Sequence, residues 1–111
     1  MKDKDKVILQ KMIVYCEEIG SFTKDLTLEG FSGNIIINRA TTQTIQNIGE
    51  LSKKLSEDLR ERNKQIPWKP IRDARNFIAH EYEGINWEDI WDIVNVSIPQ
   101  LKKQLNNILK D

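Results

Sequence analysis

The sequence predicts an all-α fold, an up-and-down bundle of four to five helices built from one domain over residues 1–111. Apolar residues recur every three or four positions through most of the chain, which is the spacing of one buried helical face. Three prolines and five glycines in 111 residues leave room for long helices. No segment alternates apolar and polar residues as a half-buried strand would. A chain of this length can bury one modest core.

The first helix is expected at residues 4–19, and Gly20 is expected to end it, since glycine tolerates the left-handed cap. Residues 21–33 are rich in Ser and Gly and are expected to form a loop that can include a short turn of helix. The expected apolar face of the first helix consists of Val7, Ile8, Met12, Tyr15 and Ile19.

The second helix is expected to start after Asn34, a suitable N-cap, and to continue to Arg62. A helix of nearly 30 residues implies a long bundle. Its expected apolar face is broad, as suits a helix packed on two neighbours. That face contains Ile37, Thr41, Thr44, Ile48, Leu51, Leu55 and Leu59, widened by Ile36, Ala40 and Ile45.

Two prolines in the segment 66–70 mark a connection, after which a third helix is expected from Pro70 to Tyr82. Gly84 is expected to close it. Asn86 can cap a fourth helix that extends to the end of the chain. Pro99 either kinks that helix or starts a fifth one.

Net charge is zero, which disfavours strong sequence-independent binding to nucleic acid. The charge is unevenly distributed, however. Residues 53–75 contain eight Lys or Arg and four acids, a local charge of +4, whereas residues 81–111 contain three Lys and six acids, a local charge of −3. Two solvated helix faces would explain this pattern equally simply.

The composition also indicates the cellular compartment of the protein and the cofactors that it is expected to lack. Cys16 is the single cysteine, so no internal disulfide can form. No apolar run approaches the roughly 20 residues that span a bilayer, and the N-terminus lacks a signal-peptide pattern. We therefore expect a cytoplasmic protein. One His, one Cys and no clustered carboxylates predict neither a metal site nor a cofactor.

The third helix carries the candidate chemistry on one side. At about 100° per residue, an apolar arc is expected to face the core, and a polar arc lies opposite. The apolar arc holds Ile71, Ala74, Phe77 and Ile78, and the polar arc holds Arg72, Asp73, Asn76, His80 and Glu83.

On the same wheel, Arg75 and Tyr82 lie at the boundary between the two arcs. Arg75 and His80, five residues apart, point about 140° away from each other. One helix does not readily aim both side chains at one point, but two copies related by a two-fold axis could. The spacing therefore favours a symmetric dimer with a composite cleft.

These residue types suit RNA cleavage. Histidine exchanges protons near neutral pH, and arginine offers a permanent planar donor fork that matches phosphate. Asparagine can hold an imidazole or a phosphate oxygen. A structural explanation stays open, because a lone histidine near a helix end is often a capping residue. From these residues alone, a helical and dimeric bundle is as far as the inference goes.

The segment from Arg75 to Tyr82, with the sequence RNFIAHEY, resembles the Arg-x4-His-x-Tyr motif of HepT, a toxin of the HEPN superfamily. HepT is the partner of MNT-type minimal nucleotidyltransferases. The resemblance continues through most of the chain, at Ile48-Gly49-Glu50, Ile66-Pro67-Trp68, Ile85-Asn86-Trp87 and the segment 99–101.

The resemblance implies a metal-independent endoribonuclease toxin that cleaves RNA in a cleft at the homodimer interface. It implies that Arg75 and His80 are the catalytic pair and that Asn76 supports them. Tyr82 matches the tyrosine to which the partner nucleotidyltransferase attaches AMP, silencing the toxin. Glu50 matches a family position, with no role assigned beyond a contact with the cleft or the partner.

Within this interpretation, Lys64, Lys69 and Arg72 are expected to flank the cleft as a local RNA track. Two other functions remain open at this stage. The chain could be a non-catalytic nucleotide-binding or partner-binding subunit of a minimal nucleotidyltransferase. It could also be a plain helical dimerisation protein, in which the motif residues would be freely replaceable.

Overall fold

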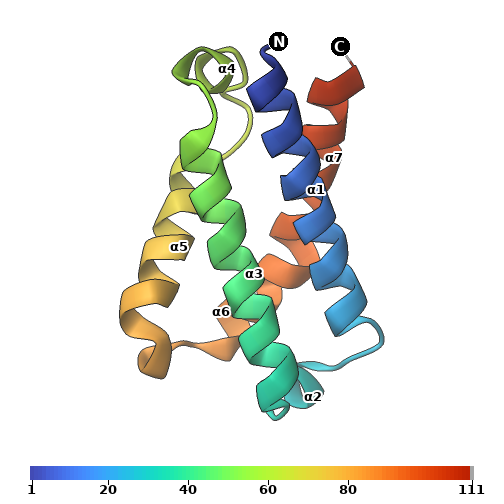
Figure 1. The fold of residues 1–111 in the computed structure, drawn as a ribbon. Helices are drawn as coiled ribbons and strands as arrows, with labels where there is room; N and C mark the ends of the chain where they lie inside the picture. The colour runs from blue at the N-terminus through green and yellow to red at the C-terminus, as the bar shows by residue number, and fades with distance from the viewer. Residues whose placement is uncertain (111) are drawn as a thin grey trace.

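The computed structural model describes residues 1–110, with the side chains of all of these except residues 79–82, and it confirms an all-α up-and-down bundle (Figure 1). Both ends of the chain lie at the same end of the bundle. No helix in this part of the chain is long and apolar enough to cross a membrane. The elements in chain order are α1 (Asp3–Thr23), α2 (Leu28–Ser32), α3 (Ile35–Lys54), α4 (Glu57–Arg62), α5 (Trp68–Glu81), η1 (Tyr82–Gly84), α6 (Trp87–Asp92), η2 (Ile93–Ser97) and α7 (Ile98–Lys110).

The helix α3 is central, because it packs against both α1 and α5, while α1 also packs against α7. The core lies along these contacts, and most of the expected apolar positions are confirmed there. Burial of these side chains is the main stabilising contribution, at roughly 25 cal/mol per Å² of apolar surface. The fully buried side chains include Leu9, Met12, Ile19, Phe31, Ile48, Ile66, Ile78 and Leu105.

The expected end of the first helix at Gly20 is wrong, since α1 continues to Thr23. A Cβ at Gly20 would meet nothing within 4 Å, so the helix accommodates this position without using it as a cap. Thr23 Oγ1 instead donates to the Ile19 carbonyl at 2.8 Å within the helix. The chain turns at Asp25, whose φ of 61° takes the left-handed conformation.

The single long helix expected at residues 34–62 is interrupted, although Asn34 caps α3 as predicted, accepting from Ile37 N at 3.1 Å. The helix α3 ends at Lys54, and Ser56 caps the separate helix α4 by accepting from Leu59 N at 3.3 Å. Asp5 of α1 completes the junction, because its Oδ1 accepts from Ser56 N at 2.9 Å. This partner outside the helix replaces the intrahelical one and explains the break.

Several expected core residues are exposed. Val7 and Ile36 are 59% and 78% exposed, because they lie on the outward sides of α1 and α3. On α5, Ile78 is buried as predicted, but Phe77 is 45% exposed. The helix α5 packs mainly on α3, and toward α6 it leaves a groove of about 290 Å³ that Phe77 and Ile90 line.

The C-terminal helical segment is continuous but irregular. Asn86 caps α6 as predicted, accepting from Glu88 N at 2.9 Å. Between α6 and α7 the chain forms one π-helical stretch, η2, and Pro99 follows as the second residue of α7. Pro99 has no N–H to donate, and the π-helical stretch, after which Ile98 N donates to the Ile93 carbonyl, precedes it. The third helix begins at Trp68, two residues before the expected Pro70, which also occupies a first turn.

The Asp5–Ser56 contact joins α1 to the start of α4. Asp5 is 2% exposed, and its Oδ2 accepts from Ser56 Oγ at 2.6 Å. Burial raises the pKa of the Asp5 carboxyl, but the two hydrogen bonds from Ser56, with the positive charge of Lys2 and Lys4, outweigh it. The pKa of Asp5 therefore lies below its ordinary value. The ionised carboxylate stabilises the fold at neutral pH, and this contribution is lost as pH falls through the lowered pKa.

We predict that Asp5→Asn lowers the free energy of unfolding at pH 7 by about 1.5–3 kcal/mol, because a charged hydrogen-bond acceptor is lost. The difference from wild type should shrink below about pH 4, where the wild-type carboxyl becomes protonated. Urea unfolding at pH 7 and pH 3 measures both values. Asp3→Asn, an exposed acid in the same first turn, is the control. An equal loss at both pH values would contradict this account.

Candidate functional site

A close approach between α3 and α5 fixes the place of the motif arginine. Gly49 of α3 faces Arg75 of α5, and a Cβ on Gly49 would lie only 2.5 Å from Arg75 Cβ and 3.3 Å from the Ile71 carbonyl oxygen. No side chain tolerates the first of these distances, so only glycine lets the helices come this close. The Cβ of Arg75 therefore lies in direct contact with the backbone of α3, which fixes where the side chain begins.

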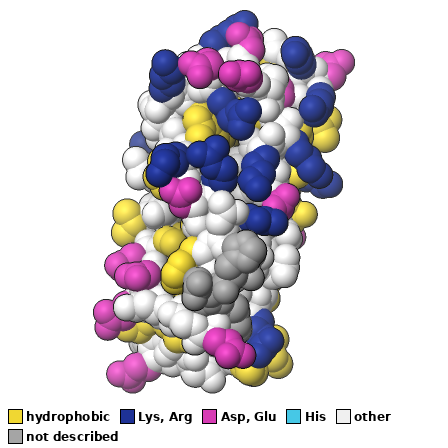
Figure 2. Space-filling view, turned by 90° about the vertical axis from the view of Figure 1, so that its left-hand side faces the viewer, with side chains coloured by type: hydrophobic (Ala, Val, Ile, Leu, Met, Phe, Trp, Pro, Cys, Tyr) yellow, Lys and Arg dark blue, Asp and Glu magenta, His cyan; other side chains and the backbone are white. Residues whose placement is uncertain are grey.

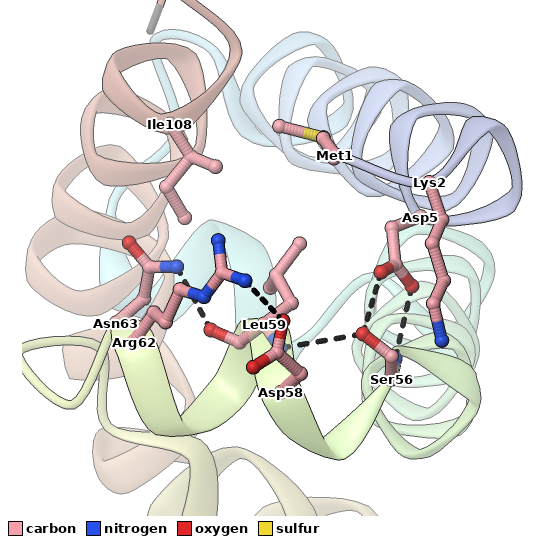
Figure 3. A pocket seen from close by; sticks show the side chains of 9 residues that line it. All are labelled: Met1, Lys2, Asp5, Ser56, Asp58, Leu59, Arg62, Asn63 and Ile108. Carbon is pink, nitrogen blue, oxygen red and sulfur yellow. Dashed lines mark hydrogen bonds and ion pairs between the residues drawn. The ribbon is translucent and has the colours of Figure 1, made fainter.

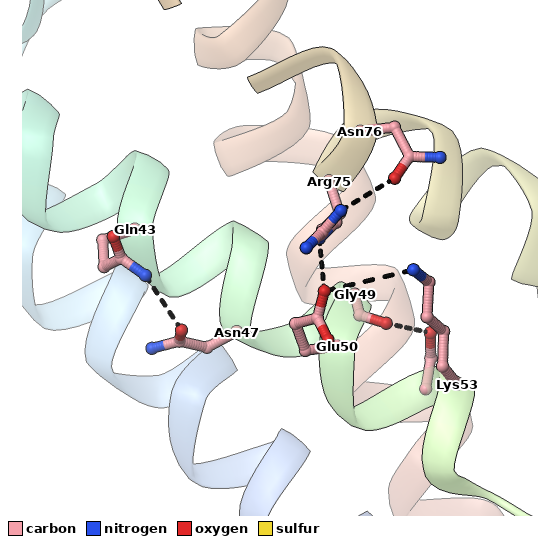
Figure 4. Close-up of polar contacts among 8 residues, drawn as sticks. Gln43, Asn47, Gly49, Glu50, Lys53, Arg75 and Asn76 are labelled. Atoms are coloured by element: carbon pink, nitrogen blue, oxygen red, sulfur yellow. Dashed lines mark hydrogen bonds and ion pairs between the residues drawn. The ribbon is translucent and has the colours of Figure 1, made fainter. Parts of the chain in front are cut away.

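The guanidinium of Arg75 is held between two side chains (Figure 4). Arg75 Nε forms an ion pair with Glu50 Oε1, and both atoms are shielded from solvent. Arg75 Nη1 donates to Asn76 Oδ1 at 3.1 Å. Glu50 follows Gly49 directly, so the residue that permits the helix contact also brings the carboxylate to the arginine.

The cluster of Lys53, Glu50 and Arg75 keeps one net positive charge. Lys53 Nζ lies 4.0 Å from the same Glu50 oxygen that Arg75 contacts. The Arg75 side chain is 28% exposed. Nε faces the Glu50 carboxylate in an ion pair, and Nη1 donates one hydrogen bond to Asn76, which leaves the other N–H groups of Nη1 and Nη2 for a ligand. A fixed, partly buried guanidinium of this kind is suited to bind a phosphate oxygen.

The structure thus brings together Arg75 and Asn76 of the predicted site. The side chains of His80 and Tyr82 lie outside the described residues, so their predicted roles stay predictions. Lys64 and Lys69 form ion pairs with acids three and four positions away, at 3.3 Å to Glu61 and 3.2 Å to Asp73. Such exposed pairs contribute little and open readily, so they do not prevent contact with phosphate. Arg72 is exposed.

Basic side chains gather on the face of the bundle that α5 occupies. Figure 2 shows Lys and Arg concentrated over the upper half of this face, at the end of the bundle where α4 lies in Figure 1. The segment with a local charge of +4 occupies this end, and its exposed members are Lys53, Lys54, Arg62, Lys64, Lys69 and Arg72. These basic side chains create a positive electrostatic potential beside the cluster of Lys53, Glu50 and Arg75.

A cavity of about 510 Å³ lies elsewhere, where α4 meets the ends of α1 and α7 (Figure 3). Its polar lining includes the Asp5–Ser56 contact and the ion pair between Arg62 and Asp58, at 2.7 Å. None of the predicted site residues whose side chains the structure describes lines it. No group of three or more His, Cys, Asp or Glu that could hold a metal ion occurs among the described side chains. Burial raises the pKa of the Cys16 thiol to about 12.

Sequence reasoning missed the parts played by Gly49, Glu50 and Lys53. A glycine inside a long predicted helix, such as Gly49, is itself a signal of close packing, because glycine otherwise destabilises a helix. Glu50 lies 25 positions before Arg75, and no helical periodicity links residues on different helices. Only the packing of α3 on α5 makes them a pair.

Comparison with known proteins points to one family. The family model described as "Ribonuclease HepT-like" matches residues 12–108. A candidate RNase of Methanocaldococcus jannaschii, MJ0125, is 34% identical over 106 residues, which cover 96% of this chain and 91% of that protein. A candidate RNase of Caldanaerobacter subterraneus, TTE0752, is 33% identical over 92% of this chain and 91% of its own length.

A protein of Thermococcus cleftensis that carries the name "Probable ribonuclease HepT" is 28% identical over 99% of this chain and the whole of its own length. No solved structure matches the chain significantly. The similarity to all three relatives extends over nearly the whole chain and is not confined to the motif on α5.

We predict that Gly49→Ala destabilises the fold by about 1–3 kcal/mol and displaces Arg75, because the added methyl group forces α3 and α5 apart. Gly20→Ala is the matched control, since its Cβ meets no atom within 4 Å and an alanine inside a helix is more stable by about 0.5–1 kcal/mol. Urea unfolding of both variants measures the effects. Equal stability of the two variants would disprove the close contact at Gly49.

Proposed function

The chain belongs to the HepT-like ribonuclease family of the HEPN superfamily, and we propose that it is a metal-independent endoribonuclease that acts as the toxin of a toxin–antitoxin pair. The observation that carries the proposal is the Arg75 guanidinium, anchored by Glu50 and Asn76 with donors left free for a phosphate. An anchored cation stabilises a phosphorane-like transition state better than a mobile one, because it needs little reorganisation during the reaction.

The proposed reaction needs two proton transfers. The imidazole of His80 accepts the proton of an RNA 2′-hydroxyl, whose oxygen attacks the adjacent phosphorus. As the new bond from the 2′-oxygen to phosphorus forms, the bond from phosphorus to the 5′-oxygen breaks, and a protonated imidazole gives its proton to the leaving oxygen. The products are a 2′,3′-cyclic phosphate and a free 5′-hydroxyl.

One chain contains a single histidine, so a base and an acid of this type must come from two copies. We therefore propose that the active form is a symmetric dimer whose cleft combines Arg75 and His80 from both chains. The wheel argument supports this arrangement, since the two positions diverge on one helix. Asn76 acts as a positioning residue through its hydrogen bond with Arg75.

Silencing by AMP on Tyr82, attached by a partner MNT-type nucleotidyltransferase, is part of the same proposal. Tyr82 is seven residues after Arg75 in the sequence, and positions seven apart on one α-helix lie on a similar side of its axis. An attached AMP would bring phosphate charge and bulk close to the arginine. It would compete with RNA for the donors that the cluster leaves open.

We predict that Arg75→Ala and His80→Ala each lower the rate of RNA cleavage by about 10²–10⁴-fold, because each removes a group that acts in the transition state. Cleavage by the wild type should continue in EDTA. The measurement is cleavage of a fluorescent RNA by purified protein, with circular dichroism to confirm that each variant is folded.

Arg62→Ala is the matched arginine control, because Arg62 is 73% exposed and forms an ion pair with Asp58 within α4. Its cleavage rate should stay within about threefold of wild type, consistent with the small energy of surface pairs. Full activity of the His80→Ala protein would overturn the proposal. Loss of wild-type activity in EDTA would overturn its metal-independent form.

We predict that charge reversal at Lys64, Lys69 and Arg72 weakens RNA binding by at least tenfold at low salt and flattens its salt dependence. The same three reversals at Lys6, Lys11 and Lys24, on and just after α1, provide a control of equal charge. Binding measured at several salt concentrations compares the two triple variants. If RNA affinity depended on salt concentration equally in both triple variants, the basic face would not be a specific binding track for RNA.

A further inference from the structure

A pocket of about 150 Å³ lies within the bundle, where α3, α5, η2 and α7 meet. We call it the α5–α7 pocket. Its innermost side chains are at most 6% exposed, and they are Ile45, Ile48, Ile98 and Leu101. The helix α5 packs mainly on α3, which leaves its side toward α7 less closely filled. Protein interiors contain few voids larger than a water molecule, so a pocket of this size needs an explanation.

The lining of the α5–α7 pocket is almost entirely apolar. Among the described side chains that form it, Ser97 alone carries a polar group, and none is charged. Pro67 and Pro70 have no backbone N–H to donate, and the Pro67 carbonyl already accepts from Ile71 N at 3.1 Å. A charged or strongly polar ligand would lose its hydration here and gain few hydrogen-bond partners in exchange. The lining therefore selects an uncharged, apolar occupant.

The pocket also has an entrance, because three of its lining residues lie at the surface. Pro67, Pro70 and Ser97 are exposed, in contrast to the buried aliphatic side chains of the interior. A small molecule can therefore enter while the bundle stays folded. An apolar cavity of about 150 Å³ lined by aliphatic and aromatic side chains stays dry and binds benzene or xenon. The volume of the α5–α7 pocket thus suits a ligand of benzene size.

The π-helical stretch η2 is a second and independent observation at the same place. Ile93 and Ser97, its first and last residues, both line the pocket. Turns of π-helix are rare in proteins, and those within a longer helical segment occur frequently at functional sites. A ligand site would explain why the irregularity lies at the wall of this pocket.

The pocket adjoins the helix contact that positions Arg75. Ala74 lines the pocket and directly precedes Arg75, while Ile48 lines it and directly precedes Gly49. An occupant would make van der Waals contacts with the side of α5 that faces α7. It would therefore help to hold α5 in place against α3.

We propose that the α5–α7 pocket is a binding site for a small, uncharged, apolar molecule of about benzene size. The site goes beyond the proposed ribonuclease function, since its ligand needs neither RNA nor a second copy of the chain. The ligand stabilises the protein, because the pocket exists only in the folded chain and binding favours the state that contains it.

The test uses the full chain with benzene as the probe and benzoate as a similar ring that carries a negative charge. Nuclear magnetic resonance of the methyl groups measures the dissociation constants, and nuclear Overhauser effects from benzene identify the methyl groups that it contacts. Ala74→Leu fills the pocket from α5. Ser97→Leu, at an exposed position, fills it from the entrance without requiring α5 to move. Ser21→Leu, at an exposed serine of α1, is the matched control.

We expect the wild type and the α1 control to bind benzene saturably, with nuclear Overhauser effects to Ile48, Ile98 and Leu101. Benzoate should bind at least tenfold more weakly than benzene. Ala74→Leu and Ser97→Leu should each bind benzene at least tenfold more weakly than the wild type.

The proposal would be overturned if the wild type bound no benzene, or if benzene contacted only methyl groups outside the pocket. Benzene affinity equal to wild type in the folded Ala74→Leu or Ser97→Leu protein would also overturn it. Benzoate bound as tightly as benzene would refute the assignment of an uncharged ligand.

Discussion

The contact of Gly49 with Arg75 is the constraint on which the candidate site depends. Because Gly49 has no Cβ, α3 and α5 approach each other until the Cβ of Arg75 contacts the backbone of α3. The carboxylate of the next residue, Glu50, forms an ion pair with Arg75 Nε. Asn76 Oδ1 accepts a hydrogen bond from Arg75 Nη1. The arginine loses rotamer freedom during folding and not during binding, which is how a site becomes preorganised. One glycine therefore links helix packing to the placement of a phosphate-binding cation.

Most of the fold could be predicted from the sequence, because helical periodicity and capping residues are local signals. Asn34 and Asn86 cap the helices that they were expected to cap. The errors arose where a partner distant in the chain decides the outcome. The break after Lys54 depends on Asp5, which lies 51 positions before Ser56 and supplies its hydrogen-bond acceptor. Phe77 has the right periodicity to be buried, but too little of the bundle covers that side of α5.

The candidate site was predictable only in part for the same reason. A motif within one helix identifies Arg75 and Asn76, and resemblance to a family assigns them a role. The carboxylate that fixes the arginine comes from another helix, so neither spacing nor a helical wheel reveals it.

The most direct test of the central claim is a nuclear magnetic resonance measurement of hydrogen exchange at Arg75 Nε, compared with Arg62 Nε in the same protein. Both arginines pair with a carboxylate, but Arg62 is 73% exposed and the Arg75 Nε atom is shielded from solvent. The account predicts slow exchange at Arg75, fast exchange at Arg62, and loss of the difference in Glu50→Gln. Exchange at Arg75 as fast as at Arg62 in the wild type would show that the guanidinium is not anchored and would contradict the account.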